Sequence, residues 1–375
     1  MNEPATAAAS DHHEAHSPLY GSRYPGLDAW RGIAACVVVL AHMKAIHMEF
    51  AHLAVMLFFV ISGYCIAASV MSCRRQGLSF GAYMVRRMRR IYPPFFFSIV
   101  YYLTTRALKL FVLNQPDRVT EMTAIQYVQN FTMTQWFTLI GQPKPAAAQN
   151  PTNFMPVYWS LNYEEQFYLV IALGLLFGRK LKMRWFLGAV TAASVVWILG
   201  FGELCRGIFF EYWPMFAVGL LVYYRLCIAE EARWRRGVEA LLLAMLIGGV
   251  ALWLGPQTAG ERGWGPDLTM TAGMGLLLIV LRPVEKIWVE RWPVRVMAKL
   301  GLMSYSLYLI HQSNLMLMRR ITGVVLPDAT PSALVMTAQL AGHIAVAVLF
   351  FWCFERPFLN RKTGNKTPVA KADNS

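Results

Sequence analysis

Long apolar segments constrain the fold of this chain more than any other feature of its sequence. A helix needs about 20 mostly apolar residues to cross the hydrocarbon core of a bilayer. Candidate segments lie at approximately 27–47, 52–72, 91–113, 158–178, 185–202, 208–224, 238–255, 267–281, 300–318 and 332–353. The sequence therefore predicts an all-α, polytopic integral membrane protein with about ten transmembrane helices.

The composition supports a membrane protein over a soluble one. Hydrophobic residues make up 56% of the chain and charged residues only 15%, whereas soluble domains carry roughly 25% charged residues. The net charge of +14 is explained by basic loops on the cytoplasmic side, so we expect no nucleic-acid partner. None of the six cysteines forms a CxxC pair, so neither a disulfide framework nor a metal site is predicted.

The distribution of basic residues predicts the orientation of the chain. With the N-terminus inside, the loops on the inner side contain "CRRQGLSFGAYMVRRMRR", "GRKLKMR" and "RLCIAEEARWRR". The positive-inside rule therefore favours a multi-pass inner-membrane protein with both termini in the cytoplasm. We expect a disordered N-terminus over residues 1–25, a transmembrane domain over 26–358 and a disordered tail over 359–375.

The first apolar segment carries ionisable residues, which are costly in a bilayer and therefore indicate a functional site. Arg31 and His42 are about 20° apart around a helix and about 16 Å apart along its axis, so they share one face. Asp28 lies within about 60° of Arg31 on that face. The alternative is that Arg31 extends to the membrane interface and His42 is a packing residue.

An arginine cluster precedes the third segment in "YMVRRMRRIYPP" and contains Arg86, Arg87 and Arg90. Such a cluster is a common topology signal. Arginine also binds phosphate through several hydrogen bonds from one planar group. If the helix begins early, Arg87 and Arg90 are neighbours on its surface and can hold a phosphorylated ligand from the cytosol.

Two further segments place polar residues among apolar ones. In "YWSLNYEEQFYLV", the adjacent residues Glu164 and Glu165 face different sides of a helix. Interfacial exposure explains one of them, and Glu164 can point inward together with Tyr168 four residues later. In "LGLMSYSLYLIHQSN", His311 shares a face with Ser304, and Tyr308 lies one turn before it. This polar stripe indicates either a lined cavity or a hydrogen-bonded seam between helices.

The order of these motifs resembles the membrane-bound acyltransferase-3 family. The motifs are "LDAWRGIAACVVVLAH", "FFVISGY", "RRMRRIYP", "WSLNYEEQFYL", "SYSLYLIH" and "FERPF", and the resemblance runs from about residue 25 to 360. Members transfer acyl groups, often acetyl, to cell-envelope carbohydrates. The resemblance implies an acyltransferase that uses acetyl-CoA as donor and no metal. Its acceptor would be a lipid-linked or exported glycan, such as an exopolysaccharide or lipopolysaccharide.

The resemblance also implies roles for individual residues. Arg31 and His42 match the pair implicated in catalysis, and Arg87 and Arg90 match the RxxR motif associated with the acyl-CoA donor. Arg86 precedes that motif and is counted with it. The residues that match the FFxxSG motif are Phe58, Phe59, Ser62 and Gly63. Glu164 matches the first glutamate of the family's "WSL..E" element.

The residue chemistry leaves several roles open. His42 can act as a general base on the acceptor hydroxyl or take the acyl group itself. Arg31 can anchor donor phosphate or stabilise developing charge, with Asp28 as its partner. Glu164 can orient His42 or bind the acceptor sugar, and we expect Tyr308 and His311 to bind substrate or support the site.

The chain departs from the family pattern at two places. Asn162 and Tyr163 stand where Ser-Val is common, and Ser313 stands where a proline often follows the histidine. A different class of protein also suits the buried charges, namely a transporter of a glycan or small anion that uses Arg, His and Glu as a proton relay. The sequence does not predict the oligomeric state.

Overall fold

The computed structural model describes residues 24–113, 122–139, 154–177, 183–201, 207–255, 264–325 and 333–359. Within these ranges the chain is helical and contains no β-strand. The α-helices are α1 (Gly26–His42), α2 (Met48–Arg75), α3 (Phe80–Leu113), α4 (Ala124–Thr132), α5 (Trp136–Leu139), α6 (Trp159–Phe177), α7 (Met183–Phe201), α8 (Trp213–Cys227), α9 (Ala232–Leu254), α10 (Gly265–Leu281), α11 (Glu285–Val289), α12 (Trp292–Leu302), α13 (Ser304–Val325) and α14 (Ala333–Phe350).

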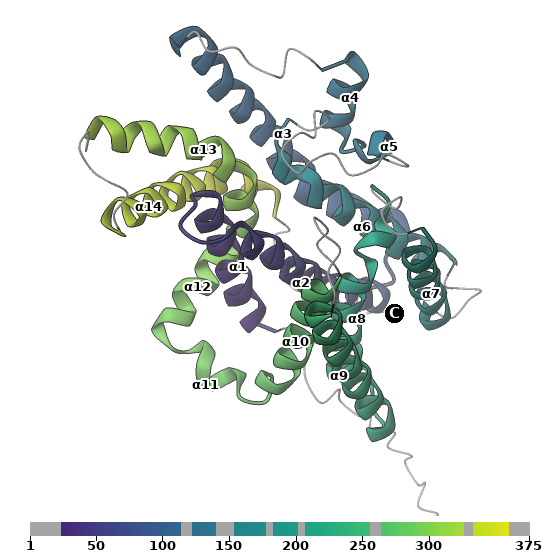
Figure 1. Ribbon diagram of the computed structural model, residues 1–375. Coiled ribbons are helices and arrows are strands. Elements are labelled where there is room, and N and C mark those ends of the chain that lie inside the picture. The colour runs from purple at the N-terminus through teal and green to yellow at the C-terminus, as the bar shows by residue number, and fades with distance from the viewer. Residues whose placement is uncertain are drawn as a thin grey trace, which may run out of the picture.

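Every predicted apolar segment contains a helix of the structure (Figure 1). Among the described residues, three helical stretches are long and apolar enough to cross a bilayer, namely Met48–Arg75, Ala232–Leu254 and Ala333–Phe358. The protein is therefore a helical membrane protein, as expected. The number of crossings and the side of the termini stay predictions. The segments predicted to be disordered, 1–25 and 359–375, lie outside the described residues except for 24, 25 and 359.

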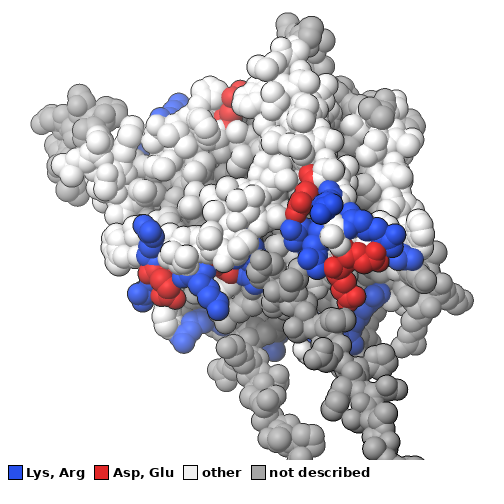
Figure 2. Space-filling model, turned by 90° about the horizontal axis from the view of Figure 1, so that it is seen from below, with Lys and Arg blue, Asp and Glu red and all other residues white. Residues whose placement is uncertain are grey.

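Lipid-facing surface is evident on two of these stretches. Only 17% of the apolar window in α9 and 22% of that in Ala333–Phe358 is buried inside the protein. Contiguous apolar surface of this extent is unfavourable in water. The charged side chains are distributed unevenly as well. Figure 2 shows that they gather in groups on one part of the face seen there, while most of the remaining described surface is uncharged. Both observations suit helices embedded in a bilayer.

Two predicted helix boundaries were wrong. The segment at 300–318 is divided at Met303, where α12 ends and α13 begins. Hydropathy could not reveal this break because the residues on both sides of it are apolar. The third helix starts at Phe80 instead of 91, so the arginine cluster is part of α3. Pro93 and Pro94 lie inside this helix, where each removes a backbone hydrogen bond.

The first two helices form the centre of the molecule. α1 packs against α2, α12 and α13, and α2 packs against α8 and α10. A Cβ atom on Gly32 of α1 would lie 2.0 Å from the Met297 carbonyl oxygen of α12, and one on Gly63 of α2 would lie 2.2 Å from the Phe216 carbonyl oxygen of α8. Small residues permit such close backbone approach between membrane helices. These contacts fix the positions of the neighbouring residues Arg31 and Ser62.

Candidate functional site

A pocket lies between α1, α2, α3, α6 and α13 and contains about 830 Å³ of empty space, counted with its opening to solvent. Its wall combines polar and aromatic side chains from five helices that are far apart in the sequence. The polar ones are Arg31, Ser62, Cys65, Arg87, Arg90, Ser160, Glu164 and Ser304, and the aromatic ones are Phe58, Phe59, Tyr168, Tyr305 and Tyr308. The predicted site residues therefore meet at one place, with the exceptions described below.

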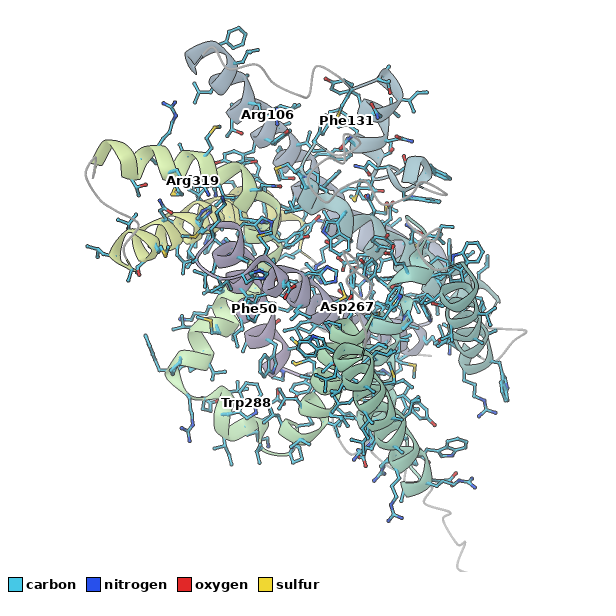
Figure 3. All side chains as sticks on the ribbon, in the orientation of Figure 1. Phe50, Arg106, Phe131, Asp267, Trp288 and Arg319 are labelled. Carbon is cyan, nitrogen blue, oxygen red and sulfur yellow. The ribbon has the colours of Figure 1, made fainter. Side chains whose placement is uncertain are left out.

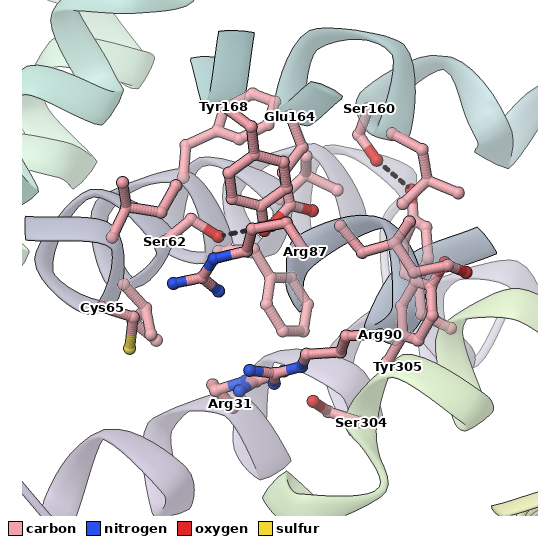
Figure 4. Close-up of a pocket in the computed structure, with 18 residues that line it drawn as sticks. Arg31, Ser62, Cys65, Arg87, Arg90, Ser160, Glu164, Tyr168, Ser304 and Tyr305 are labelled. Atoms are coloured by element: carbon pink, nitrogen blue, oxygen red, sulfur yellow. Dashed lines mark hydrogen bonds between the residues drawn. The ribbon is translucent and has the colours of Figure 1, made fainter. Parts of the chain in front are cut away.

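Three arginines dominate the electrostatics of this pocket. The guanidinium groups of Arg31, Arg87 and Arg90 point into the same space, between Cys65 and Ser304 (Figure 4). The guanidinium of Arg87 also lies 5.3 Å from the ring centroid of Tyr168, within cation–π range. Among the described lining residues Glu164 is the one carboxylate, so the pocket carries excess positive charge and suits an anionic ligand.

Arg86 lies elsewhere. Its side chain is exposed on α3 and does not line the pocket, whereas Arg87 and Arg90 do. The difference follows from the early start of α3, because residues three apart share a face of a helix while adjacent residues do not. Asp28, half-buried on α1, is also outside the pocket wall.

Glu164 is held by two hydroxyl groups. Ser62 Oγ donates to its Oε1 over 3.0 Å and Tyr168 OH donates to the same oxygen over 2.5 Å. Glu165 lines a neighbouring pocket that Glu164 also borders, and it accepts a hydrogen bond from Tyr92. The two adjacent carboxylates therefore bond to different helices, α2 for Glu164 and α3 for Glu165, and Glu164 points inward together with Tyr168 as predicted. The hydrogen bonds of Glu164 do not reach His42.

The FFxxSG residues divide between the pocket and the packing of α2. Phe58 lines the pocket and its ring contacts the Tyr308 ring edge-on, with centroids 6.1 Å apart. Phe59 also lines the pocket, and its ring packs against that of Phe167 with centroids 5.4 Å apart. Gly63 lies in the close contact with α8, and Ser62 holds Glu164. The motif therefore positions α2 and one polar group of the site.

His42 lies beside the pocket and does not line it. It is half-buried at the end of α1, and its Nδ1 lies 2.9 Å from the Val38 carbonyl oxygen. Its ring contacts the ring of His311 on α13, with centroids 4.8 Å apart. His311 in turn contacts Tyr308, which lines the pocket. The polar stripe predicted on "LGLMSYSLYLIHQSN" therefore lines a cavity through Ser304 and Tyr308. Its last member, His311, contacts His42 of α1.

Sequence analysis missed several residues of the site. Glu355 does not line the pocket but lies close enough to interact electrostatically with Arg90 and Arg31. It is 1% exposed and accepts hydrogen bonds from the Ser306 backbone amide at 3.0 Å and from the Ser306 hydroxyl. The final motif "FERPF" was the available signal for it. Ser304 Oγ is buried without a hydrogen-bond partner, and Tyr305 and Cys65 line the pocket. Nothing in the local sequence distinguished these three from packing residues.

A further histidine, His52 of α2, takes part in helix packing. His52 Nε2 lies 2.9 Å from Asp267 Oδ2, which joins the start of the second turn of α2 to the first turn of α10. Figure 3 shows Asp267 in the central part of the molecule. The His52 ring also stacks on Trp159, with centroids 5.9 Å apart. Neither His52 nor Asp267 lines the arginine pocket.

Comparison with known proteins supports the family resemblance that the sequence motifs indicated. A family model described as "Acyltransferase domain" matches residues 24–354. O-acetyltransferase OatA of Staphylococcus aureus (strain NCTC 8325 / PS 47) is 25% identical over 248 residues, which cover 65% of this chain and 37% of OatA. A Komagataeibacter xylinus protein named as membrane-bound transacylase BcsY is 27% identical over 362 residues, covering 93% of this chain and 86% of that protein.

A third relative is a Bacillus subtilis (strain 168) protein named as peptidoglycan O-acetyltransferase YrhL, 28% identical over 191 residues. The match covers 48% of this chain and 28% of that protein, so the chain spans only about a third of the length of OatA and YrhL. The family model, in contrast, includes every helix that contributes to the arginine pocket. The chain belongs to the acyltransferase-3 family.

Proposed function

We propose that the protein is an acyl-CoA-dependent O-acyltransferase of the inner membrane that moves an acyl group, acetyl above all, to a hydroxyl of an envelope or exported carbohydrate. The observation that carries this proposal is the convergence of Arg31, Arg87 and Arg90 on one pocket. Phosphate groups, which coenzyme A carries, are the ligands that clustered guanidinium groups bind best. A transporter is not favoured because the whole pocket lies within the matched acyltransferase domain.

The geometry suits a donor that extends along α1. Arg31 and His42 lie on one face of that helix, about 16 Å apart along its axis. With coenzyme A phosphates at the arginines, the pantetheine arm runs past Tyr305 and Tyr308 toward His42. Ser304 Oγ, buried and without a hydrogen-bond partner, lines this path and supplies a hydrogen bond to the ligand.

The chemical step needs a base for the acceptor hydroxyl. His42 removes the hydroxyl proton as the hydroxyl oxygen bonds to the acyl carbon. The carbon–sulfur bond of the thioester breaks, and the proton ends on the sulfur of coenzyme A. Such general base catalysis contributes typically 10²–10⁴ in rate. In the alternative route, the same imidazole first takes the acyl group and the hydroxyl then receives it.

The acceptor class follows from the relatives. OatA and YrhL are named as O-acetyltransferases, YrhL for peptidoglycan, so a sugar hydroxyl of the cell envelope is the expected acceptor. Glu164 faces the pocket with one carboxylate. Such a group binds sugar hydroxyls as a hydrogen-bond acceptor.

The experiment that tests this function follows the acetyl group. Membranes that contain wild type, His42→Ala or His47→Ala receive acetyl-CoA labelled in the acetyl group, at matched protein levels, and base-labile label in envelope glycans is counted. We expect label with wild type and with His47→Ala, whose histidine is exposed, and a loss of at least about 10²-fold with His42→Ala. Either of two results contradicts the proposal. One is label at the wild-type level in membranes with His42→Ala, and the other is a wild-type melting temperature that does not change when coenzyme A is added.

A further inference from the structure

The contact between His42 and His311 is the feature of the site that the proposed chemistry leaves unused. The two rings come from α1 and α13, and their planes meet at 71° with centroids 4.8 Å apart. His311 is fully buried. Two imidazoles at this distance affect one another strongly when either gains a proton, because one ring is fully buried and the other half-buried, and charge is screened weakly in such surroundings.

Backbone carbonyl groups select the tautomer of both rings. His42 Nδ1 lies 2.9 Å from the Val38 oxygen, and His311 Nδ1 lies 2.7 Å from the Tyr308 oxygen. A carbonyl oxygen only accepts, so each Nδ1 carries a hydrogen and donates it. Each neutral ring therefore has its lone pair on Nε2.

The Nε2 atom of His311 is buried and has no hydrogen-bond partner. A buried polar atom without a partner is costly, and in a native structure it needs an explanation. The neighbouring ring of His42 supplies one, because His42 gains an Nε2–H and a positive charge when it removes the proton of the acceptor hydroxyl. His311 then presents an electron pair and a neutral ring to that charge.

We propose that His311 is a positioning residue that orients His42 and stabilises the imidazolium formed on it during acyl transfer. This inference rests on the proposed function. No bond to substrate is made by His311, and the proton count is unchanged: one proton moves from the acceptor hydroxyl to His42 Nε2 and from there to the thiolate of coenzyme A. The neutral ring of His311 stabilises that charge electrostatically, while the Nε2–H of His42 stays directed at the reacting oxygen and sulfur.

The test compares three variants of the full-length protein in membranes. His311→Leu removes the lone pair, His311→Gln restores an acceptor oxygen near the position of Nε2, and His343→Leu is the control. His343 is also fully buried, with neither ring nitrogen hydrogen-bonded. It lies near enough to His311 for an electrostatic interaction, but no ring contact joins it to His42 among the described residues, so it controls for the loss of a buried imidazole beside His311. Acetyl transfer is measured over a range of acetyl-CoA concentrations, together with the melting-temperature shift caused by coenzyme A.

We expect His311→Leu to lower kcat by about 10²-fold. The KM for acetyl-CoA and the melting-temperature shift caused by coenzyme A should both stay at wild-type values. The kcat of His311→Gln should be at least tenfold higher than that of His311→Leu. A purely structural role of His311 would not explain this recovery. The inference is overturned, and the proposed function is not, if His311→Leu keeps the wild-type kcat. The same holds if the loss of kcat in His311→Gln or in His343→Leu equals that in His311→Leu. Absence of transfer by the wild type overturns the proposed function and this inference together.

Discussion

At the scale of single residues, the position of each arginine on α3 decides its expected effect. Arg87 lines the pocket and lies against the rings of Tyr83 and Tyr168. Replacing it in Arg87→Gln removes a charged donor whose hydrogen bonds are worth about 1.5–3 kcal/mol. We therefore expect KM for acetyl-CoA to rise about 10- to 100-fold, with a smaller change in kcat because His42 lies outside this part of the pocket.

The matched control is Arg89→Gln. Arg89 has the same charge and lies on the same helix, but its side chain is exposed. Initial-rate measurements at varied acetyl-CoA concentration should give a KM close to wild type for this variant. Equal KM values for Arg87→Gln and Arg89→Gln would mean that the pocket arginines do not bind the donor.

At the scale of helices, the contact between α2 and α8 depends on glycine. A methyl group on Gly63 would lie 2.2 Å from the Phe216 carbonyl oxygen, so Gly63→Ala must separate the two helices. Overpacking of this kind costs typically 1–3 kcal/mol. It should lower the melting temperature in detergent and weaken acyl transfer, because Ser62, which donates a hydrogen bond to Glu164, moves with α2. A Cβ on Gly248 of α9 meets nothing within 4 Å, so Gly248→Ala should keep both properties.

At the scale of the whole molecule, the expected orientation can be tested with introduced cysteines. Ile125 on α4 is 70% exposed and Trp234 at the start of α9 is 51% exposed. In a background without native cysteines, a membrane-impermeant maleimide added to intact spheroplasts should label Ile125→Cys. Trp234→Cys should react only after permeabilisation, because the basic start of α9 is expected in the cytoplasm. The reverse labelling pattern would invert the topology.

Features that depend on local sequence could be predicted. Apolar length placed a helix in each of ten segments, and spacing on a helix put Arg87 and Arg90 on one face and separated Glu164 from Glu165. These properties follow from the period of the helix and the hydrophobic cost of the bilayer core. The membership of the chain in its family also followed from the order of short motifs, which is a property of the sequence alone.

Features that depend on contacts between helices were decided by the tertiary structure. The sequence by itself could not place Arg31 beside Arg87 and Arg90, or His42 against His311, since these residues belong to different helices. Their meeting depends on how far the helices slide and rotate against one another. Close backbone approach at glycines such as Gly32 and Gly63 sets that register, and no local periodicity encodes which helix a glycine will contact. The sequence therefore determined the helices and their chemistry, whereas packing decided which side chains form the site.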